Sequence, residues 1–175
     1  QIRLPTRLPT RVRQRLGLAL LLPMALRTTV RCSDWRDELH LFQAVVDVCP
    51  ESARGHKGLA QAWRQDGQLA AAETHYRRAI EIYPRFDTAH YNLGILLLDT
   101  TRFEEALFHF ARACALRPTF AEAHLNRGVA LFHLGRLPRA REATARAVDL
   151  RPDWGVARQN LNDVQAALDR QEIKR

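Results

Sequence analysis

The stretch that decides the fold lies between residues 89 and 118. It contains AHYNLGILLL at residues 89–98 and FEEALFHFARACALRP at residues 103–118. Apolar residues recur in it at intervals of three and four, as at Leu93, Leu96 and Leu97, and this spacing places them on one face of an α-helix. Pro118 lacks an N–H group and ends the second segment. The stretch therefore predicts two amphipathic helices joined by a short turn.

The same pattern recurs along the chain with a period of 34 residues. Three whole copies are predicted, at residues 53–86, 87–120 and 121–154. Small residues at fixed places let two helices approach closely, and a single hairpin cannot bury its own apolar face. The copies are therefore expected to stack. The recurring positions are Pro84, Pro118 and Pro152; Ala72, Ala106 and Ala140; Ala79, Ala113 and Ala147; and Ala60, Gly94 and Gly128.

Taken together, these columns resemble the tetratricopeptide repeat (TPR). The resemblance implies an all-α fold, a right-handed superhelix of stacked helix-turn-helix units. The third copy departs from the pattern at two places. Arg127 stands where the second copy has Leu93, and Thr144 replaces the aromatic residue found at Phe110. These changes are expected to weaken packing without changing the fold.

The flanks supply the ends of the stack. Residues 34–50 resemble a second helix without its first helix, and residues 155–171 form a lone first helix that serves as a C-terminal capping helix. Residues 1–15 are basic and are expected to lack stable order. Residues 16–31 contain an apolar run of eleven residues, which covers about half of a ~30 Å hydrocarbon core. This segment is the remnant of a membrane helix, a targeting segment or a non-native stretch.

The charge of the chain is concentrated at one end. The 175 residues carry a formal charge of +8, with 46% hydrophobic and 26% charged residues, a composition typical of a globular protein. Residues 1–33 hold seven arginines and no acidic residue, so the remainder is nearly neutral. A nucleic-acid-binding face is therefore not expected.

A second resemblance covers residues 27–60. The arginine-rich start, Trp35 with Glu38, and VCPESAR at residues 48–54 look like the junction in transmembrane, TPR-containing O-mannosyltransferases, where the last membrane helix enters the lumenal repeats. This resemblance implies the repeat region of a dolichyl-phosphate-mannose protein mannosyltransferase in the endoplasmic reticulum membrane, here without its catalytic membrane domain. The alternative is a free-standing cytoplasmic scaffold unrelated to glycosylation.

No catalytic constellation is found in the sequence, which contains no HExxH, GxSxG or phosphate-loop motif. The three cysteines lack zinc or disulfide spacing. His56, His90 and His124 each occupy the fourth place of a predicted first helix. They are expected to pack between hairpins, because equivalent atoms of neighbouring repeats lie roughly 10 Å apart and zinc–nitrogen bonds are about 2 Å long. No metal and no cofactor are predicted.

The candidate binding residues lie on the first helices, which form the inner face. A row of asparagines offers both hydrogen-bond donors and acceptors to a peptide backbone, as in the repeats of O-linked N-acetylglucosamine transferase, which these resemble. The alternatives are that the amides only satisfy neighbouring groups and that the apolar residues belong to the core. The predicted partner is a protein or peptide, with membrane association through the N-terminal segment. The predicted peptide-binding residues are Asn92, Asn126, Asn160, Tyr91, Ile95, Leu98, Leu125, Val129 and Phe132.

Overall fold

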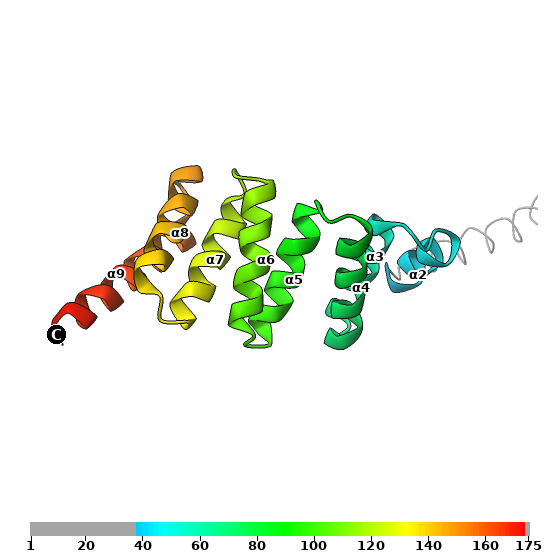
Figure 1. The fold of residues 1–175 in the computed structure, drawn as a ribbon, viewed down its shortest axis with the longest axis horizontal. Coiled ribbons are helices and arrows are strands. Elements are labelled where there is room, and N and C mark those ends of the chain that lie inside the picture. The colour runs from blue at the N-terminus through cyan, green and yellow to red at the C-terminus, as the bar shows by residue number, and fades with distance from the viewer. Residues whose placement is uncertain (1–37, 174–175) are drawn as a thin grey trace, which may run out of the picture. The chain divides into compact units, whose positions relative to one another are not determined.

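A computed structural model describes residues 38–173 of the chain (Figure 1). Those residues form eight α-helices, and no strand occurs among them. The chain divides into two units, residues 1–41 and residues 42–175, and all contacts described below lie within the second. The predicted basic segment 1–15 and apolar segment 16–31 lie outside the described residues.

The helices follow the predicted repeats. Three hairpins, α3–α4, α5–α6 and α7–α8, fall within the three copies, while α2 lies in the half repeat and α9 is the terminal helix. Helix α9 ends two residues later than predicted. The bounds are α2 Glu38–Val48, α3 Ala53–Gln65, α4 Leu69–Ile82, α5 Asp87–Asp99, α6 Phe103–Leu116, α7 Ala121–His133, α8 Leu137–Leu150 and α9 Gly155–Ile173.

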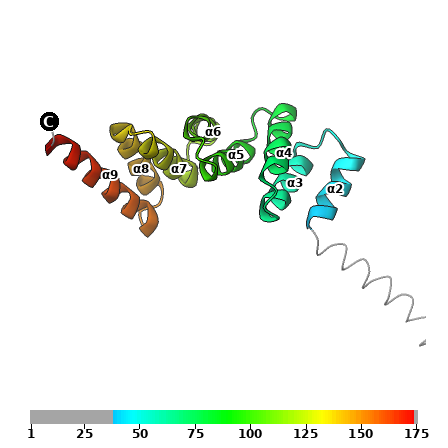
Figure 2. The same cartoon turned by 90° about the horizontal axis from the view of Figure 1, so that it is seen from below.

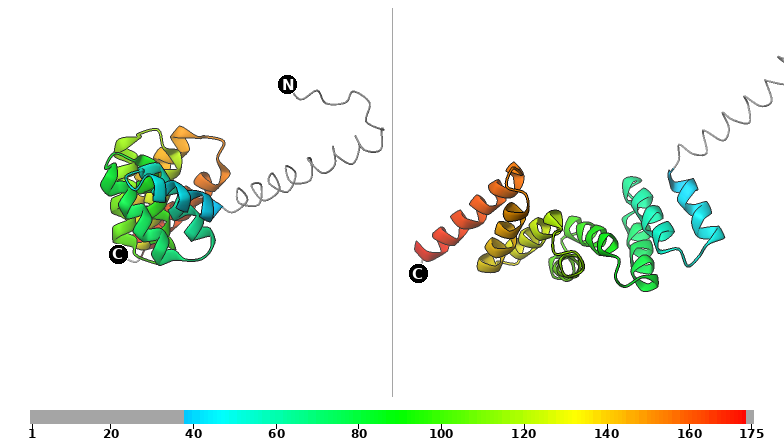
Figure 3. Two further views of the ribbon diagram at one scale, coloured as in Figure 1. Left: turned by 90° about the vertical axis from the view of Figure 1, so that its right-hand side faces the viewer. Right: turned by 90° about the horizontal axis from the view of Figure 1, so that it is seen from above.

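From α3 to α9, the helices pack mainly against their neighbours in the chain. The first helices of consecutive repeats, α3, α5, α7 and α9, also touch one another. The hairpins of residues 42–173 therefore follow one another in chain order (Figures 2 and 3). The predicted all-α stack of helical hairpins with a terminal capping helix is confirmed.

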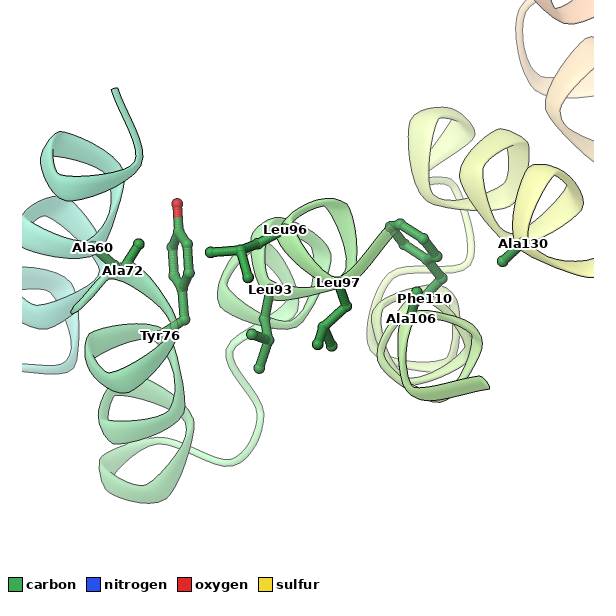
Figure 4. Packing of buried hydrophobic residues seen from close by; sticks show 9 residues of the cluster. All are labelled: Ala60, Ala72, Tyr76, Leu93, Leu96, Leu97, Ala106, Phe110 and Ala130. Atoms are coloured by element: carbon green, nitrogen blue, oxygen red, sulfur yellow. The ribbon is translucent and has the colours of Figure 1, made fainter. Parts of the chain in front are cut away.

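In the first and second hairpins, a small residue of the first helix packs with an aromatic residue of the second helix. In the second repeat, a Cβ atom added to Gly94 would lie 2.7 Å from the ring of Phe110, so only glycine permits this approach. Phe110, Leu93 and Leu97 are completely buried, and they belong to one cluster with Tyr76 of the first repeat (Figure 4). Tyr76 and Phe110 occupy equivalent positions 34 residues apart, and this aromatic column links the first two repeats through a shared core.

The turn inside each hairpin requires a left-handed backbone conformation. Gly67 and Gly135 adopt it with φ of 79° and 69°, and Thr101 occupies the same place in the second repeat with φ of 60°. A β-branched side chain is strained at positive φ, whereas glycine is not. The second hairpin therefore folds with local strain that the first and third lack.

Histidine pairs join the two helices of the first and second hairpins. In the second repeat, Nδ1 of His90 lies 3.0 Å from Nδ1 of His109, and Nε2 of His90 donates to the carbonyl oxygen of Pro84 over 3.2 Å. Because a carbonyl oxygen only accepts, Nε2 of His90 carries a proton, and its Nδ1 accepts from His109. Both rings are then neutral. The first repeat repeats this arrangement with His56, His75 and Pro50.

The third hairpin lacks the pair. Nε2 of His124 donates to the carbonyl oxygen of Pro118 over 3.1 Å, but Ala143 stands where the other repeats have His75 and His109. The buried Nδ1 of His124 has no hydrogen-bond partner among the described residues. The histidine column was predicted to pack between neighbouring hairpins. Its members in the first two repeats are buried, but their side-chain partners lie within the same hairpin, and of these hydrogen bonds only the one to the proline carbonyl reaches the preceding segment.

Replacing Thr101 with glycine is expected to stabilise the protein by about 0.5–1 kcal/mol, because the strain at positive φ is removed while the unfolded chain gains some freedom. Urea unfolding of the two proteins measures the difference. Gly135→Thr is the matched control and is expected to destabilise the protein. Equal stability of Thr101→Gly and the unchanged protein would contradict the proposed strain.

Acidification is expected to destabilise the second hairpin before the carboxylates titrate. Burial, and then the neighbouring His90 and Arg77, lower the pKa of His109 to about 4, with Glu105 and Glu73 opposing. An unfolded histidine binds its proton near pH 6.5, so the unfolded state gains protons first as the pH falls. Unfolding free energy should drop by about 1–2 kcal/mol between pH 6.5 and 5, after allowance for solvent screening.

The histidine contribution is measured by urea unfolding across this pH range. In His109→Gln, the amide can donate to His90 without titrating, so the drop should become smaller by the share of His109. Part of the pH dependence should remain, because burial also lowers the pKa of His75 and His124. His133→Gln is the control, because His133 is exposed, and it should retain the pH dependence of the unchanged protein. An identical pH dependence in His109→Gln would contradict the assignment.

Candidate functional site

Two depressions lie against the first helices of the repeats. The first has a volume of about 370 Å³ and lies between α3, α4 and α5. The second has a volume of about 90 Å³ and lies between α7, α8 and α9. Gln61, Arg64, Gln65, Leu69, Tyr76, Asn92 and Asp99 line the first, and Gly128, Val129, Phe132, Thr144, Asn160, Asp163 and Val164 line the second.

The two depressions are built from equivalent positions two repeats apart. Four places contribute to both, so the depressions are two instances of one structural site. The two depressions differ in volume and in chemistry, and a glutamine and an arginine in the first are replaced by a valine and a phenylalanine in the second. The predicted change from a polar to an apolar inner face is therefore visible in their linings. The equivalent pairs are Gln61 and Val129, Arg64 and Phe132, Tyr76 and Thr144, and Asn92 and Asn160.

An ion pair crosses the polar depression. The guanidinium Nη2 of Arg64 donates to Oδ2 of Asp99 over 2.8 Å, from α3 to α5. Both side chains are partly exposed, so the pair contributes little to stability. It instead presents one positive and one negative group beside the amide of Asn92, which suits a polar segment of a ligand.

Asn126, the middle member of the asparagine row, already has a partner in the protein. Its Nδ2 donates to the hydroxyl oxygen of Tyr91 over 3.2 Å, and the ring of Tyr91 packs against Phe120 with centroids 4.6 Å apart. Burial and the nearby Glu122 raise the pKa of Tyr91, so this hydroxyl stays protonated. Asn126 thus joins two repeats, whereas Asn92 and Asn160 line the depressions.

The predicted apolar residues separate into three groups. Val129 and Phe132 line the second depression, and Phe132 is 38% exposed. Tyr91, Ile95 and Leu98 are half-buried and pack against the central cluster. Their outer surfaces are the part that remains available to a ligand.

Leu125 is the exception, because it is only 5% exposed. It lies in a cluster with Ala147 of α8 and Ala157 of α9. The prediction that Leu125 is a peptide-binding residue of the inner face is therefore wrong. It precedes Asn126 by one residue, and that rotation of about 100° along the helix turns its side chain into the contact between α7, α8 and α9.

Sequence analysis did not assign four residues of the second depression to a binding site, namely Gly128, Thr144, Asp163 and Val164. A signal was present for Thr144, because it interrupts the aromatic column of Tyr76 and Phe110. That interruption was interpreted only as weaker packing. A 34-residue spacing also links His75 and His109 and could have revealed the histidine pairs.

The described residues show neither a metal site nor a membrane span. Across residues 38–173, no group of three or more histidine, cysteine, aspartate or glutamate side chains is placed to hold a metal ion. No helix in that range is long and apolar enough to cross a membrane. Burial raises the pKa of Cys114 to about 11, so its thiol stays protonated and is a poor nucleophile.

Comparison with known proteins shows the repeat family and partial similarity to one enzyme class. The chain is 35% identical over 81 residues to human protein O-mannosyl-transferase TMTC1, a match that covers 46% of this chain and 9% of that protein. The chain thus spans about a tenth of the length of this relative.

Solved structures share the arrangement of the helices. MamA superposes with a TM-score of 0.72 at 18% identity, covering 81% of this chain and 83% of MamA. The first TPR of Spaghetti (RPAP3), solved with an HSP90 peptide bound, superposes with a TM-score of 0.65 at 23% identity, covering 67% and 93%.

Family models described as TPR repeat and tetratricopeptide repeat match residues 60–100 and 91–155, which together include the second and third predicted copies and most of the first. With the hairpin stack, the shared aromatic column and the similarity of the solved structures, these matches show that the chain belongs to the tetratricopeptide repeat family.

Proposed function

We propose that the chain binds a segment of another protein along its first helices. The observation that carries this proposal is the pair of equivalent depressions, each lined by an asparagine of the predicted row. An amide offers a donor and an acceptor to any peptide backbone, so it can hold an extended segment without requiring a particular sequence. The bound peptide named for the RPAP3 structure supports this use of the fold.

Partner side chains would provide the specificity. The polar depression suits hydrogen-bonding or charged side chains, since Arg64 and Asp99 offer both signs of charge. The apolar depression and the partly exposed Phe132 suit an apolar side chain. Burial of a few apolar anchors should supply most of the affinity.

The similarity to protein O-mannosyl-transferases supports a role for this binding in glycosylation. We propose that the repeats hold acceptor proteins for a membrane mannosyltransferase, on the lumenal side of the endoplasmic reticulum. The support is the similarity over residues that include part of the repeat region, together with the junction-like sequence at residues 27–60. The catalytic chemistry would reside outside the repeats.

The binding role can be tested with a phage-displayed library of random nine-residue peptides, selected on the full chain and then measured by fluorescence anisotropy. Phe132→Glu should weaken binding at least tenfold, because a carboxylate would have to be buried against the apolar anchor. Raising salt from about 0.1 to about 0.5 M should change binding less than twofold, because apolar contacts are not screened. Asn160→Ala, which removes the amide lining the apolar depression, should cost about 1–2 kcal/mol of binding free energy.

Two control variants separate binding from folding. Phe108 lies on the second helix α6 and is 59% exposed, so Phe108→Glu should bind normally. Tyr91→Phe removes only the internal partner of Asn126 and should preserve binding, since the amide stays in place. Binding that is lost in high salt but unchanged by Phe132→Glu would assign the interaction to the basic residues 1–33. It would contradict the proposed binding along the first helices.

A further inference from the structure

The apolar depression occurs where the third repeat lacks the aromatic side chain of the other repeats. In the second repeat, the ring of Phe110 covers Gly94 so closely that an added Cβ would lie 2.7 Å from it. In the third repeat, Thr144 occupies the place of the ring. Its hydroxyl turns back and donates to the carbonyl oxygen of Ala140 over 2.7 Å. Thr144 still meets Gly128 closely, since a Cβ added to Gly128 would overlap its hydroxyl oxygen. The cavity lies beside this contact, where α7 and α8 meet α9.

The size of this cavity matches one aliphatic side chain. A cavity of about 150 Å³ can hold benzene, which corresponds to roughly 25 Å³ for each carbon atom. At that ratio, a volume of about 90 Å³ accommodates three to four carbon atoms, the size of a valine or leucine side chain. Val129 and Val164 supply apolar walls, and Val164 is 4% exposed.

The polar part of the lining indicates what lies beside that side chain. In the lining, Asp163 is the charged residue and Asn160 is the residue with an amide side chain. Gln159 donates to Oδ1 of Asp163 over 2.9 Å, which holds the carboxylate in place. A carboxylate at the rim of an apolar cavity favours a cation or an N–H donor in the ligand.

We infer that the Thr144 cavity, bounded by Gly128, Val129, Phe132, Thr144, Asn160, Asp163 and Val164, is a specificity pocket. It takes a leucine-sized side chain of a partner segment whose neighbouring residue is basic. This inference rests on the proposed peptide-binding function and adds to it a defined anchor and its chemistry.

Two probes test the pocket directly: acetyl-Lys-Leu-Lys methylamide and its alanine counterpart acetyl-Lys-Ala-Lys methylamide. They are titrated into the full chain while backbone amide signals are followed by NMR. The leucine probe should shift the signals of Gly128, Thr144 and Val164. The alanine probe should bind at least tenfold more weakly, because about three buried carbon atoms are lost.

Filling the cavity from within the protein should separate binding from stability. Thr144→Phe places a ring in the cavity, so the leucine probe should no longer shift Gly128 or Val164, while circular dichroism and a melting curve report whether the variant stays folded. Thr144→Met fills the cavity with a more adaptable side chain and should have the same effect on binding. Phe108→Ala is the control, because Phe108 lies on α6 outside the cavity and is 59% exposed, so this variant should retain the probe.

The alternative results overturn the inference in distinguishable ways. Equal affinity for both probes, or retained binding in folded Thr144→Phe, would exclude the pocket. Shifts at Asn92 without shifts at Thr144 would exclude the pocket but leave peptide binding along the first helices supported. An absence of shifts at both residues would contradict peptide binding along the first helices as well. Self-association that is lost in Thr144→Phe would assign the cavity to a second copy of the chain.

Discussion

The close approach of Gly94 to the ring of Phe110 is the contact on which the architecture depends. It sets the spacing of the two helices in the second hairpin, since a single added methyl group would overlap the ring. The same ring lies in one cluster with Leu97 of its own repeat and Ala130 of the next (Figure 4). One packing rule therefore fixes both the geometry of a hairpin and its attachment to a neighbour, and repetition of that rule extends the stack.

The histidine pairs fix the relative orientation of two helices that otherwise meet only through nonspecific apolar contacts. An apolar contact tolerates small rotations, but the hydrogen bond between His90 and His109 forms only when their Nδ1 atoms meet. The second bond, from His90 to the carbonyl oxygen of Pro84, connects the hairpin to the end of the preceding one. Position 143 is alanine in the third hairpin, so its two helices are held without this bond.

The fold could be predicted from the sequence because the 34-residue period marks positions that make similar helix-packing contacts in each repeat. Proline, alanine and glycine columns predicted the helix pairs and their ends to within a few residues. Contacts made by only one repeat were harder to predict. Leu125 was assigned to the inner face because α7 is apolar on several sides, and only packing from α8 and α9 decides which side is covered. The asparagine row was visible, but the bond from Asn126 to Tyr91 depends on how two repeats sit together.

The unequal chemistry of the two depressions would give a bound segment a direction. A ligand that lies along the first helices meets Arg64 and Asp99 at one end and Phe132 with Val164 at the other. Reversing the ligand would place an aliphatic side chain beside an ion pair and a polar one beside valine, so the two orientations are not equivalent. The repeats would therefore orient a bound chain as well as hold it, and would present its two ends to different surroundings.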